Sequence, residues 1–353
     1  SSIFQHVFSG PCGIDPYAGA VSNVYQDLFG EGSYTGKGIY DVDGFEASLA
    51  GRIPENTILS HDLFEGIFAR CGLVADLELF EDFPSHYQVA ASRSHRWIRG
   101  DWQLLPWIAG FSGKAIPILS RWKMIDNLRR SLSAPAMIFI LLASWTLPHV
   151  PDGLWSGYVL LALAAPAIVS ICRGLILPRS GISKDSHVRA VGKDVLHGCV
   201  YMAIALALLA HRSWLALDAI GRTLFRLLIS HRLLLEWVTS AQAKLRASLS
   251  LMHFTWALRG AVFIVAAFAA IVAYFNPANL NAAAPFLALW CVSPFFAQLI
   301  SLPPPSAEPE PASTADALSL RLAGRRIWRF FTTFVDEQNH ALPPDNFQED
   351  QMG

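Results

Sequence analysis

Apolar residues are distributed unevenly along the chain, and their longest runs define its organisation. A bilayer core about 30 Å thick requires roughly 20 apolar residues in helical form. Four stretches meet this requirement, at about 132–150, 154–177, 257–276 and 281–302. Residues 1–120 differ, because short apolar runs alternate there with charged residues and glycine. The pattern predicts a soluble domain over 1–120 and a helical membrane bundle over 121–302.

Basic residues indicate the orientation of these spans. They lie before the first span, after the second and before the third, whereas the joints at 148–153 and 276–279 carry no lysine or arginine. The positive-inside rule places the basic segments in the cytoplasm and both joints outside. We therefore expect a multi-pass protein of the plasma membrane whose soluble parts are cytoplasmic.

Residues 195–235 fit two arrangements. The stretch 195–210 is apolar but barely long enough to cross a bilayer. Asp218, Arg222 and Arg226 recur every four residues, which gives 213–235 one polar face. The positive-inside rule requires an even number of crossings between 177 and 257. The polar face favours an interfacial helix without a full crossing, and the alternative is a hairpin in which 195–210 pairs with 213–235.

Composition narrows the classes of function. Hydrophobic residues make up 53% and charged residues 16% of the 353 residues, against about 25% charged in an ordinary soluble domain. The formal net charge of −1 argues against a nucleic-acid partner. The five cysteines show no metal-ligand spacing. Residues 303–315 are rich in proline and predict a linker, and both ends are typical of a piece of a longer polypeptide.

A glycine-rich run is the first candidate for chemistry. The nine residues Gly30–Gly38 contain four glycines, which would let a ligand approach the backbone. Asp41 and Asp43 follow as a D-x-D pair, which can bind a divalent metal and through it a diphosphate. A plain surface loop explains the same residues.

The second candidate is the run Leu59–Gly66. Asp62 stands beside His61 after a turn, and a carboxylate in such a place suits general base catalysis. Asp62 would equally serve as the N-cap of a helix over 63–71. Sequence spacing leaves both interpretations open.

The third candidate combines arginine and tryptophan. Arg93 and Arg96 precede Trp97, and two further tryptophans, Trp102 and Trp107, follow. Arginine binds phosphate oxygens through its planar fork, and an indole offers a flat surface for a sugar ring. A juxtamembrane helix with interfacial tryptophans is the alternative.

The order of these clusters resembles that of processive membrane glycosyltransferases. A His-Asp is followed about thirty residues later by R-x-x-R-W and then by a membrane bundle. The runs G-E-G-S-Y-T-G-K-G-I-Y-D-V-D, L-S-H-D-L-F-E-G and H-R-W-I-R-G-D-W-Q-L-L-P-W are similar to cyclic β-1,2-glucan synthases, the family 84 glycosyltransferases. The terminal P-P-D-N-F-Q-E-D resembles the start of that family's glycoamylase-like domain, which places the beginning of this domain in 316–353.

The resemblance implies a fold and an activity. Residues 1–120 would be the C-terminal portion of an α/β, GT-A-like nucleotide-sugar glycosyltransferase domain, followed by the α-helical transmembrane bundle in a bacterial inner membrane. UDP-glucose would be the donor. The product would be a β-1,2-glucan that is later cyclised, made with inversion at the anomeric carbon.

The resemblance also assigns roles to residues. Asp62 would be the catalytic base, with His61 beside it. Arg93 and Arg96 would offset charge on the leaving diphosphate, and Trp97 would hold the acceptor glucose. Four further residues are expected on the acceptor side: Tyr34, Tyr40, Asp43 and Trp102.

A divalent metal, Mg²⁺ or Mn²⁺, is expected for the intact enzyme, with ligands upstream of this chain. Asp43 is only nineteen residues before Asp62, too close for the family's D-x-D, so Asp41 to Asp43 is expected in an acceptor-side strand and turn. We expect the chain alone to be inactive. Its partners would be UDP-glucose, the glucan, membrane lipid and downstream domains of the same polypeptide.

Two alternatives remain from the sequence. One is another processive membrane glucan synthase that forms a different linkage, since no residue indicates regiochemistry. The other is a non-enzymatic transporter or scaffold subunit. A transport pathway would favour ionisable residues within the spans, and these spans contain almost none apart from Arg173.

Overall fold

The fold is known from a computed structural model of the chain. It describes residues 2–9, 20–34, 36, 38–52, 57–59, 62–74, 83–111, 116–148, 152–176, 184–236, 248–303, 313–337 and 340–344. The chain divides into two compact units, Ser1–Pro304 and Pro305–Gly353, which are considered separately.

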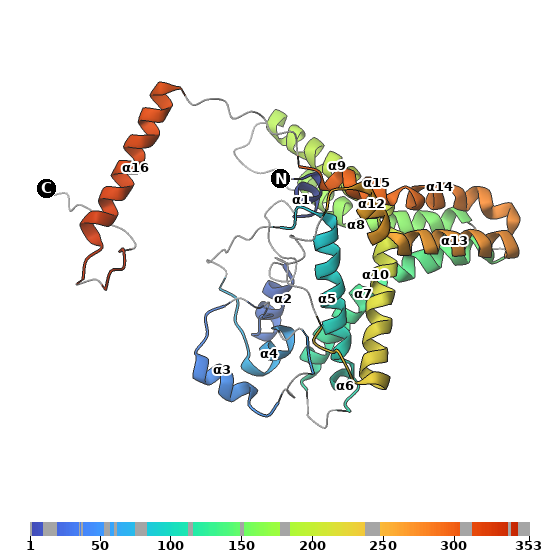
Figure 1. The fold of residues 1–353 in the computed structure, drawn as a ribbon, viewed down its shortest axis with the longest axis horizontal. Helices are drawn as coiled ribbons and strands as arrows, with labels where there is room; N and C mark the ends of the chain where they lie inside the picture. The colour runs from blue at the N-terminus through green and yellow to red at the C-terminus, as the bar shows by residue number, and fades with distance from the viewer. Residues whose placement is uncertain are drawn as a thin grey trace. The chain divides into compact units, whose positions relative to one another are not determined.

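Every regular element in these ranges is a helix (Figure 1). In chain order they are α1 (Ile3–Phe8), α2 (Ala20–Phe29), α3 (Val42–Leu49), α4 (Asp62–Ala69), α5 (Tyr87–Gln103), α6 (Leu105–Ile108), α7 (Ile118–Thr146), α8 (Asp152–Ile176), α9 (Lys184–Ala207), α10 (Leu209–Phe225), the π-helical turn η1 (Arg226–Ser230), α12 (Leu251–Ala257), α13 (Arg259–Phe275), the 3-10 turn η2 (Pro277–Asn279), α14 (Leu280–Cys291), α15 (Ser293–Ser301) and α16 (Thr314–Phe334).

The expected α/β, GT-A-like fold of residues 1–120 is wrong for the part of the chain that the structure describes, because that part contains no β-strand. A strand needs a neighbour whose backbone groups pair with it over several residues. In the glycine-rich segment, the N–H of Gly32 does donate to the carbonyl of Cys71 at 2.7 Å, but this contact does not extend into a ladder. The expected strand and turn at Asp41 to Asp43 is instead the start of α3.

A buried apolar cluster holds the bundle together. It joins α7, α8, α9, α10, α13 and α14, and its largest fully buried side chains are Trp145 and Trp290. Both indoles pack with Phe286 of α14, at ring-centroid distances of 5.4 and 6.3 Å. The indole N–H of Trp290 donates to the carbonyl of Leu206 at 3.0 Å, so the apolar core has a specific polar contact as well.

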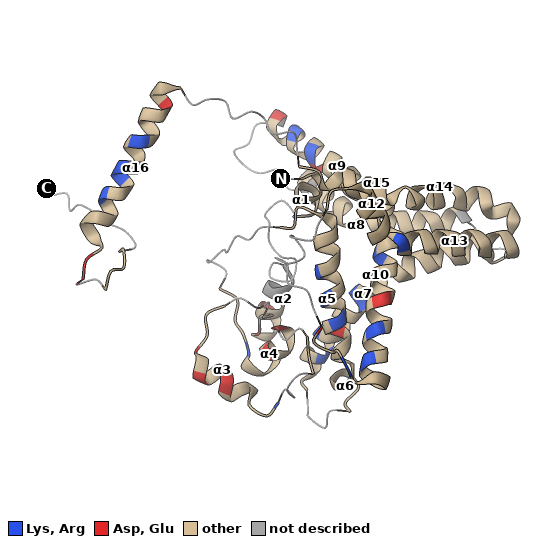
Figure 2. Ribbon diagram, in the orientation of Figure 1, with Lys and Arg blue, Asp and Glu red and all other residues tan. Residues whose placement is uncertain are grey.

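Charge is segregated within the first unit. Figure 2 shows charged side chains along α5, α7 and α10 and almost none along α13 and α14. In sequence, α14 carries no charged residue and α13 carries only Arg259. The apolar helices therefore match the part of the chain expected in the membrane, while α5 packs against α10 and α7.

Two helices are long and apolar enough to cross a membrane, over Gly153–Cys172 and Asp185–Ala207. The pairs α12 with α13 and η2–α14 with α15 pass the same test together, although they bend by 59° and 42°. Two to four candidate spans are thus present in the described residues. The predicted spans 154–177, 257–276 and 281–302 fall on these elements, and the predicted span 132–150 falls largely on α7, which does not pass the test.

Residues 195–235 fall on α9, α10, η1 and the segment that follows. Residues 195–207 form the last half of α9, which begins earlier than expected at Lys184. After a break at Leu208, α10 packs mainly on α5 and α7. One face of α10 is therefore covered by protein, whereas Trp214, Leu217 and Phe225 are exposed. Whether 195–235 is interfacial or a hairpin stays a prediction.

The second unit contains one long helix in the ranges that the structure describes. The Ser313 hydroxyl caps α16 by accepting from the backbone N–H of Asp316 at 3.1 Å. The expected linker at 303–315 lies mostly outside the described residues, and so does P-P-D-N-F-Q-E-D after its two prolines.

A close helix crossing offers a test of the fold. A Cβ at Gly260 of α13 would overlap the indole ring of Trp214 on α10. We expect Gly260→Ala to lower the free energy of unfolding by about 1–3 kcal/mol, because rigid rings and backbone must then move apart. The measurement is thermal unfolding in detergent.

Gly221→Ala is the matched control. Gly221 is also helical, and an added Cβ there would meet nothing within 4 Å. This change should be neutral or stabilise by about 0.5–1 kcal/mol. Equal effects of the two changes would contradict the observed crossing of α10 and α13.

Candidate functional site

Asp62 is the first residue of α4 and is half-buried. The backbone of Gly36 faces its carboxyl group, since a Cβ at Gly36 would lie 3.1 Å from both carboxylate oxygens. Gly36 also has φ +84°, a conformation that glycine adopts without strain. The backbone of the glycine-rich segment therefore lies close to the Asp62 carboxylate, and a side chain at Gly36 would cover this carboxylate.

Lys123 fixes the start of this glycine-rich segment. Its ammonium group, on α7, donates to the Glu31 carboxylate at 2.9 Å and to the carbonyl of Gly32 at 2.9 Å. The Lys123 side chain is only 5% exposed. A buried ammonium group is stable only with such partners, so Glu31 and Gly32 are held against α7.

Tyr34 lies near the same carboxylate. Burial raises the pKa of the Tyr34 hydroxyl, and the nearby Tyr40, Glu65 and Asp62 raise it further. Tyr40 is exposed, and its ring packs on Phe45 with centroids 4.6 Å apart. The acceptor-side role of Tyr34 and Tyr40 stays a prediction.

The R-x-x-R-W residues lie on α5. The guanidinium of Arg93 lies 4.2 Å from the ring centroid of Trp97, a cation–π contact between adjacent turns of the helix. Arg93, Arg96 and Trp97 are all half-buried. One helix therefore presents two cations and an indole together, as recognition of a diphosphate and a sugar requires.

Trp102 has a defined partner on α7. Its indole N–H donates to the Ser131 hydroxyl at 2.9 Å, which directs the polar edge of the ring toward α7. This contact gives Trp102 a packing role in addition to the predicted acceptor role.

Asp41 and Asp43 are exposed at the beginning of α3. The Asp41 carboxylate accepts from the backbone N–H of Gly44 at 2.7 Å and so caps the helix. In the described ranges, no group of three or more histidine, cysteine or acidic residues could hold a metal. Among the described residues, Asp41 and Asp43 therefore belong to no such group, and His61 lies outside these residues.

Asp62 and the R-x-x-R-W helix are joined by packing and by one side chain. Phe64 of α4 packs edge-on against Trp107 of α6, with centroids 5.1 Å apart. The backbone N–H of Leu59 donates to the Oε1 atom of Gln103, the last residue of α5, at 2.7 Å. Leu59, three residues before Asp62, is thus attached to the end of α5.

Asp101 is a buried carboxyl group on the same helix. Burial raises its pKa to about 7, although the Asn127 amide, which donates to its Oδ1 atom at 3.0 Å, and the charge of Arg130 oppose this shift. His95 shows the complementary effect, because burial lowers its pKa against the influence of Asp218. α5 therefore carries titratable groups whose charge depends on contacts with neighbouring helices.

The structure also reveals residues that the sequence did not single out. Lys123 resembles any other basic residue before a span, so no local signal predicted its burial. Gln103 had a signal, because it is a lone amide beside Trp102, Leu104 and Leu105. A polar side chain in such an apolar run has to be buried with partners.

Comparison with known proteins supports the motif analysis. No family model matches the chain. The cyclic beta-(1,2)-glucan synthase NdvB of Rhizobium meliloti (strain 1021) is 40% identical over 351 residues, which cover 99% of this chain and 12% of NdvB. The resemblance to cyclic β-1,2-glucan synthases is thus confirmed, and the chain is similar over nearly its whole length to a segment of one.

Proposed function

We propose that this chain is a segment of a membrane glucosyltransferase that elongates a β-1,2-glucan, which is later cyclised. The observation that carries the proposal is the 40% identity to NdvB across 99% of the chain. The candidate spans agree with a membrane location. UDP-glucose is the proposed donor, and the bacterial inner membrane, with the soluble parts cytoplasmic, is the proposed site of synthesis.

The proposed mechanism is a single displacement with inversion, and it follows from the resemblance to glucan synthases. The Asp62 carboxylate would take the proton of the acceptor 2-hydroxyl as its oxygen bonds to the anomeric carbon of glucose. The bond from that carbon to the diphosphate oxygen breaks, and UDP leaves. An α-linked donor then gives a β-linked product with no covalent glucosyl-enzyme.

The other residues would bind and orient the reactants. Arg93 and Arg96 would offset the charge of the departing diphosphate, and Trp97 would stack on the acceptor glucose. Tyr34, which lies near Asp62, and Tyr40, which lies near Tyr34, would contact the glucan. A divalent metal is proposed for the intact enzyme; the described residues do not provide its ligands, and no step above depends on it.

Asp62→Asn tests the assignment of the base. In the full-length polypeptide, this change should lower the rate of glucan synthesis by about 10²–10⁴-fold, because an amide cannot accept the proton. The measurement is incorporation of labelled glucose from UDP-glucose in membranes. Asp185→Asn, which changes an exposed aspartate in the first turn of α9, is the control. Unchanged synthesis in the Asp62→Asn variant would remove Asp62 from the mechanism.

The chain by itself is proposed to be inactive. It spans about an eighth of the length of NdvB, so much of the enzyme would lie in other parts of the polypeptide. Membranes that contain only this chain, supplied with UDP-glucose and Mg²⁺ or Mn²⁺, should form no glucan above background. Robust polymer from these membranes would contradict the proposal.

Lys123→Met tests whether the glycine-rich segment must be held against α7. Glu31 and the carbonyl of Gly32 would lose their donor, and the backbone at Gly36 would move relative to Asp62. We expect a loss of activity of roughly 10²-fold, as for displacements of about 1 Å in active sites.

Lys193→Met on α9 removes an exposed lysine and is the matched control. It should leave the rate of glucan synthesis unchanged. If both lysine changes alter the rate equally, the buried contacts of Lys123 do not position the segment.

A further inference from the structure

Gln103 is among the most deeply buried polar side chains in the described ranges, with 1% of its surface exposed. Both ends of its amide are used. Oε1 accepts from the backbone N–H of Leu59 at 2.7 Å, and Nε2 donates to the carbonyl of Leu234 at 2.9 Å. A glutamine amide is suited to this because it carries a donor and an acceptor at once.

The first of these two segments carries the proposed base. Leu59 precedes Asp62 by three residues. Its neighbour Ile58 is fully buried in one apolar cluster with Phe64, which follows Asp62. The backbone is therefore fixed on both sides of Asp62, and the bond to Gln103 sets its place relative to α5.

The second segment, residues 231–236, follows the π-helical turn at the end of α10. His231 and Leu233 have φ of 50° and 57°, in the left-handed region that non-glycine residues rarely adopt. Such a backbone is strained for a residue that has a Cβ atom. It persists where surrounding contacts impose it, and these conformations gather at functional sites.

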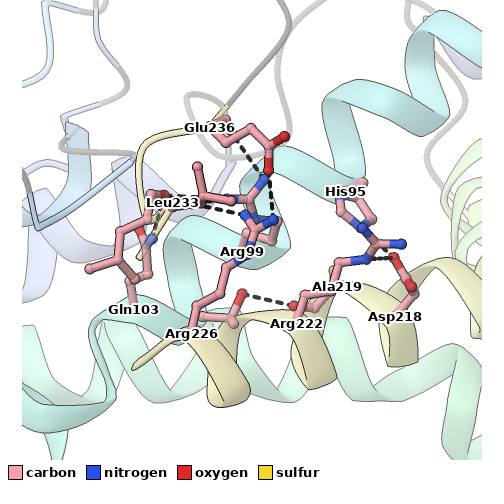
Figure 3. Close-up of polar contacts among 11 residues, drawn as sticks. His95, Arg99, Gln103, Asp218, Ala219, Arg222, Arg226, Leu233 and Glu236 are labelled. Atoms are coloured by element: carbon pink, nitrogen blue, oxygen red, sulfur yellow. Dashed lines mark hydrogen bonds and ion pairs between the residues drawn. The ribbon is translucent and has the colours of Figure 1, made fainter. Parts of the chain in front are cut away.

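Three side chains impose this conformation. Besides Gln103, Arg99 donates to the carbonyl of Glu236 at 2.7 Å and to that of Leu234 at 3.3 Å. Arg226 donates to the carbonyl of Leu233 at 2.8 Å and to the Glu236 carboxylate at 2.6 Å. In Figure 3 the side chains of Arg99 and Gln103, from α5, and of Arg226, from η1, point toward the segment that contains Leu233 and Glu236.

We propose that Gln103 is a positioning residue for glucosyl transfer. It attaches Leu59, three residues before Asp62, and the segment 231–236 to α5. Trp97 lies on the same helix, six residues before Gln103, which is about 9 Å along the axis. The base, the arginines of α5 and residues 231–236 are thereby held in fixed positions relative to one another. Residues 231–236 then form a third part of the transfer site, beside Asp62 and the R-x-x-R-W residues. This inference rests on the proposed role of Asp62.

Gln103→Met in the full-length polypeptide is the direct test, because methionine has a similar volume and makes neither hydrogen bond. The expected result is a kcat lower by roughly 10–100-fold, as for a misplaced catalytic group. The KM for UDP-glucose should change by less than about threefold, because the interaction affects the reacting geometry rather than uniform binding.

Gln298→Met is the matched control. Gln298 is a half-buried glutamine of α15 whose Nε2 donates to the carbonyl of Leu249 at 2.8 Å. The change removes one hydrogen bond of the same kind without touching Leu59 or Leu234. We expect the thermal unfolding temperature of this variant to fall by an amount comparable to that of Gln103→Met, with kcat unchanged.

Gln103→Glu decides the case if the methionine variant does not fold. A carboxylate oxygen still accepts from Leu59, but the donor to Leu234 is lost. Its kcat should lie between those of the wild type and of Gln103→Met. A kcat within twofold of the wild type in both Gln103 variants would overturn the proposal. A kcat loss in these variants that equals the loss in Gln298→Met would also overturn it, and so would a change in KM by the same factor as the change in kcat.

Asp62→Asn, measured in parallel, separates this inference from the proposed function. If Asp62→Asn abolishes synthesis while the Gln103 variants keep their kcat, Gln103 does not position the site and the proposed mechanism stands. If Asp62→Asn leaves synthesis intact, the assignment of the base fails first.

Discussion

A polar helix that packs against its neighbours needs hydrogen-bond partners for most of its inward polar side chains, and α5 is such a helix. Its Tyr87 hydroxyl lies 2.7 Å from Nδ1 of His211, and His95 lies 3.0 Å from the Asp218 carboxylate. Leaving one of these groups without a partner would cost about 1–3 kcal/mol. The positions of α10 and α7 are therefore specified by polar contacts as well as by apolar packing.

This constraint connects the membrane bundle to the candidate site. α10 receives contacts from α5 along much of its length and also packs on α13. At its far end, α5 holds the turn before Asp62 through Gln103. A displacement of the apolar helices would consequently reach Asp62 through contacts that are present in the fold, which makes α5 the structural link between the span-forming helices and the site.

Local chemistry allowed several features to be predicted. The helix expected over 63–71 is α4, from Asp62 to Ala69, and three of the four expected spans fall on helices that pass a span test. The glycines of the 30–38 segment were expected to allow a close approach, and Gly36 does face Asp62. These features depend on residues close in sequence.

Two features were not predicted correctly: the fold of residues 1–120 and the contacts between residues far apart in sequence. The α/β expectation for residues 1–120 came from a resemblance, and the described residues there fold as helices and connecting segments. The partners of Lys123 and Gln103 are about 90, 44 and 131 residues away in sequence. Hydrogen bonds across such separations leave no periodic pattern, so the sequence alone could not predict the partners of these two side chains.

An experimental structure of the full-length polypeptide with UDP and a short β-1,2-glucan bound tests the role of Asp62 as the base most directly. The measured quantity is the distance from the Asp62 carboxylate to the terminal 2-hydroxyl of the glucan. We predict a separation of about 2.6–3.2 Å or one bridging water, with Gln103 still bonded to Leu59 and Leu234. A glucan end held by other residues, with Asp62 facing away from it, would contradict the role of Asp62 as the base.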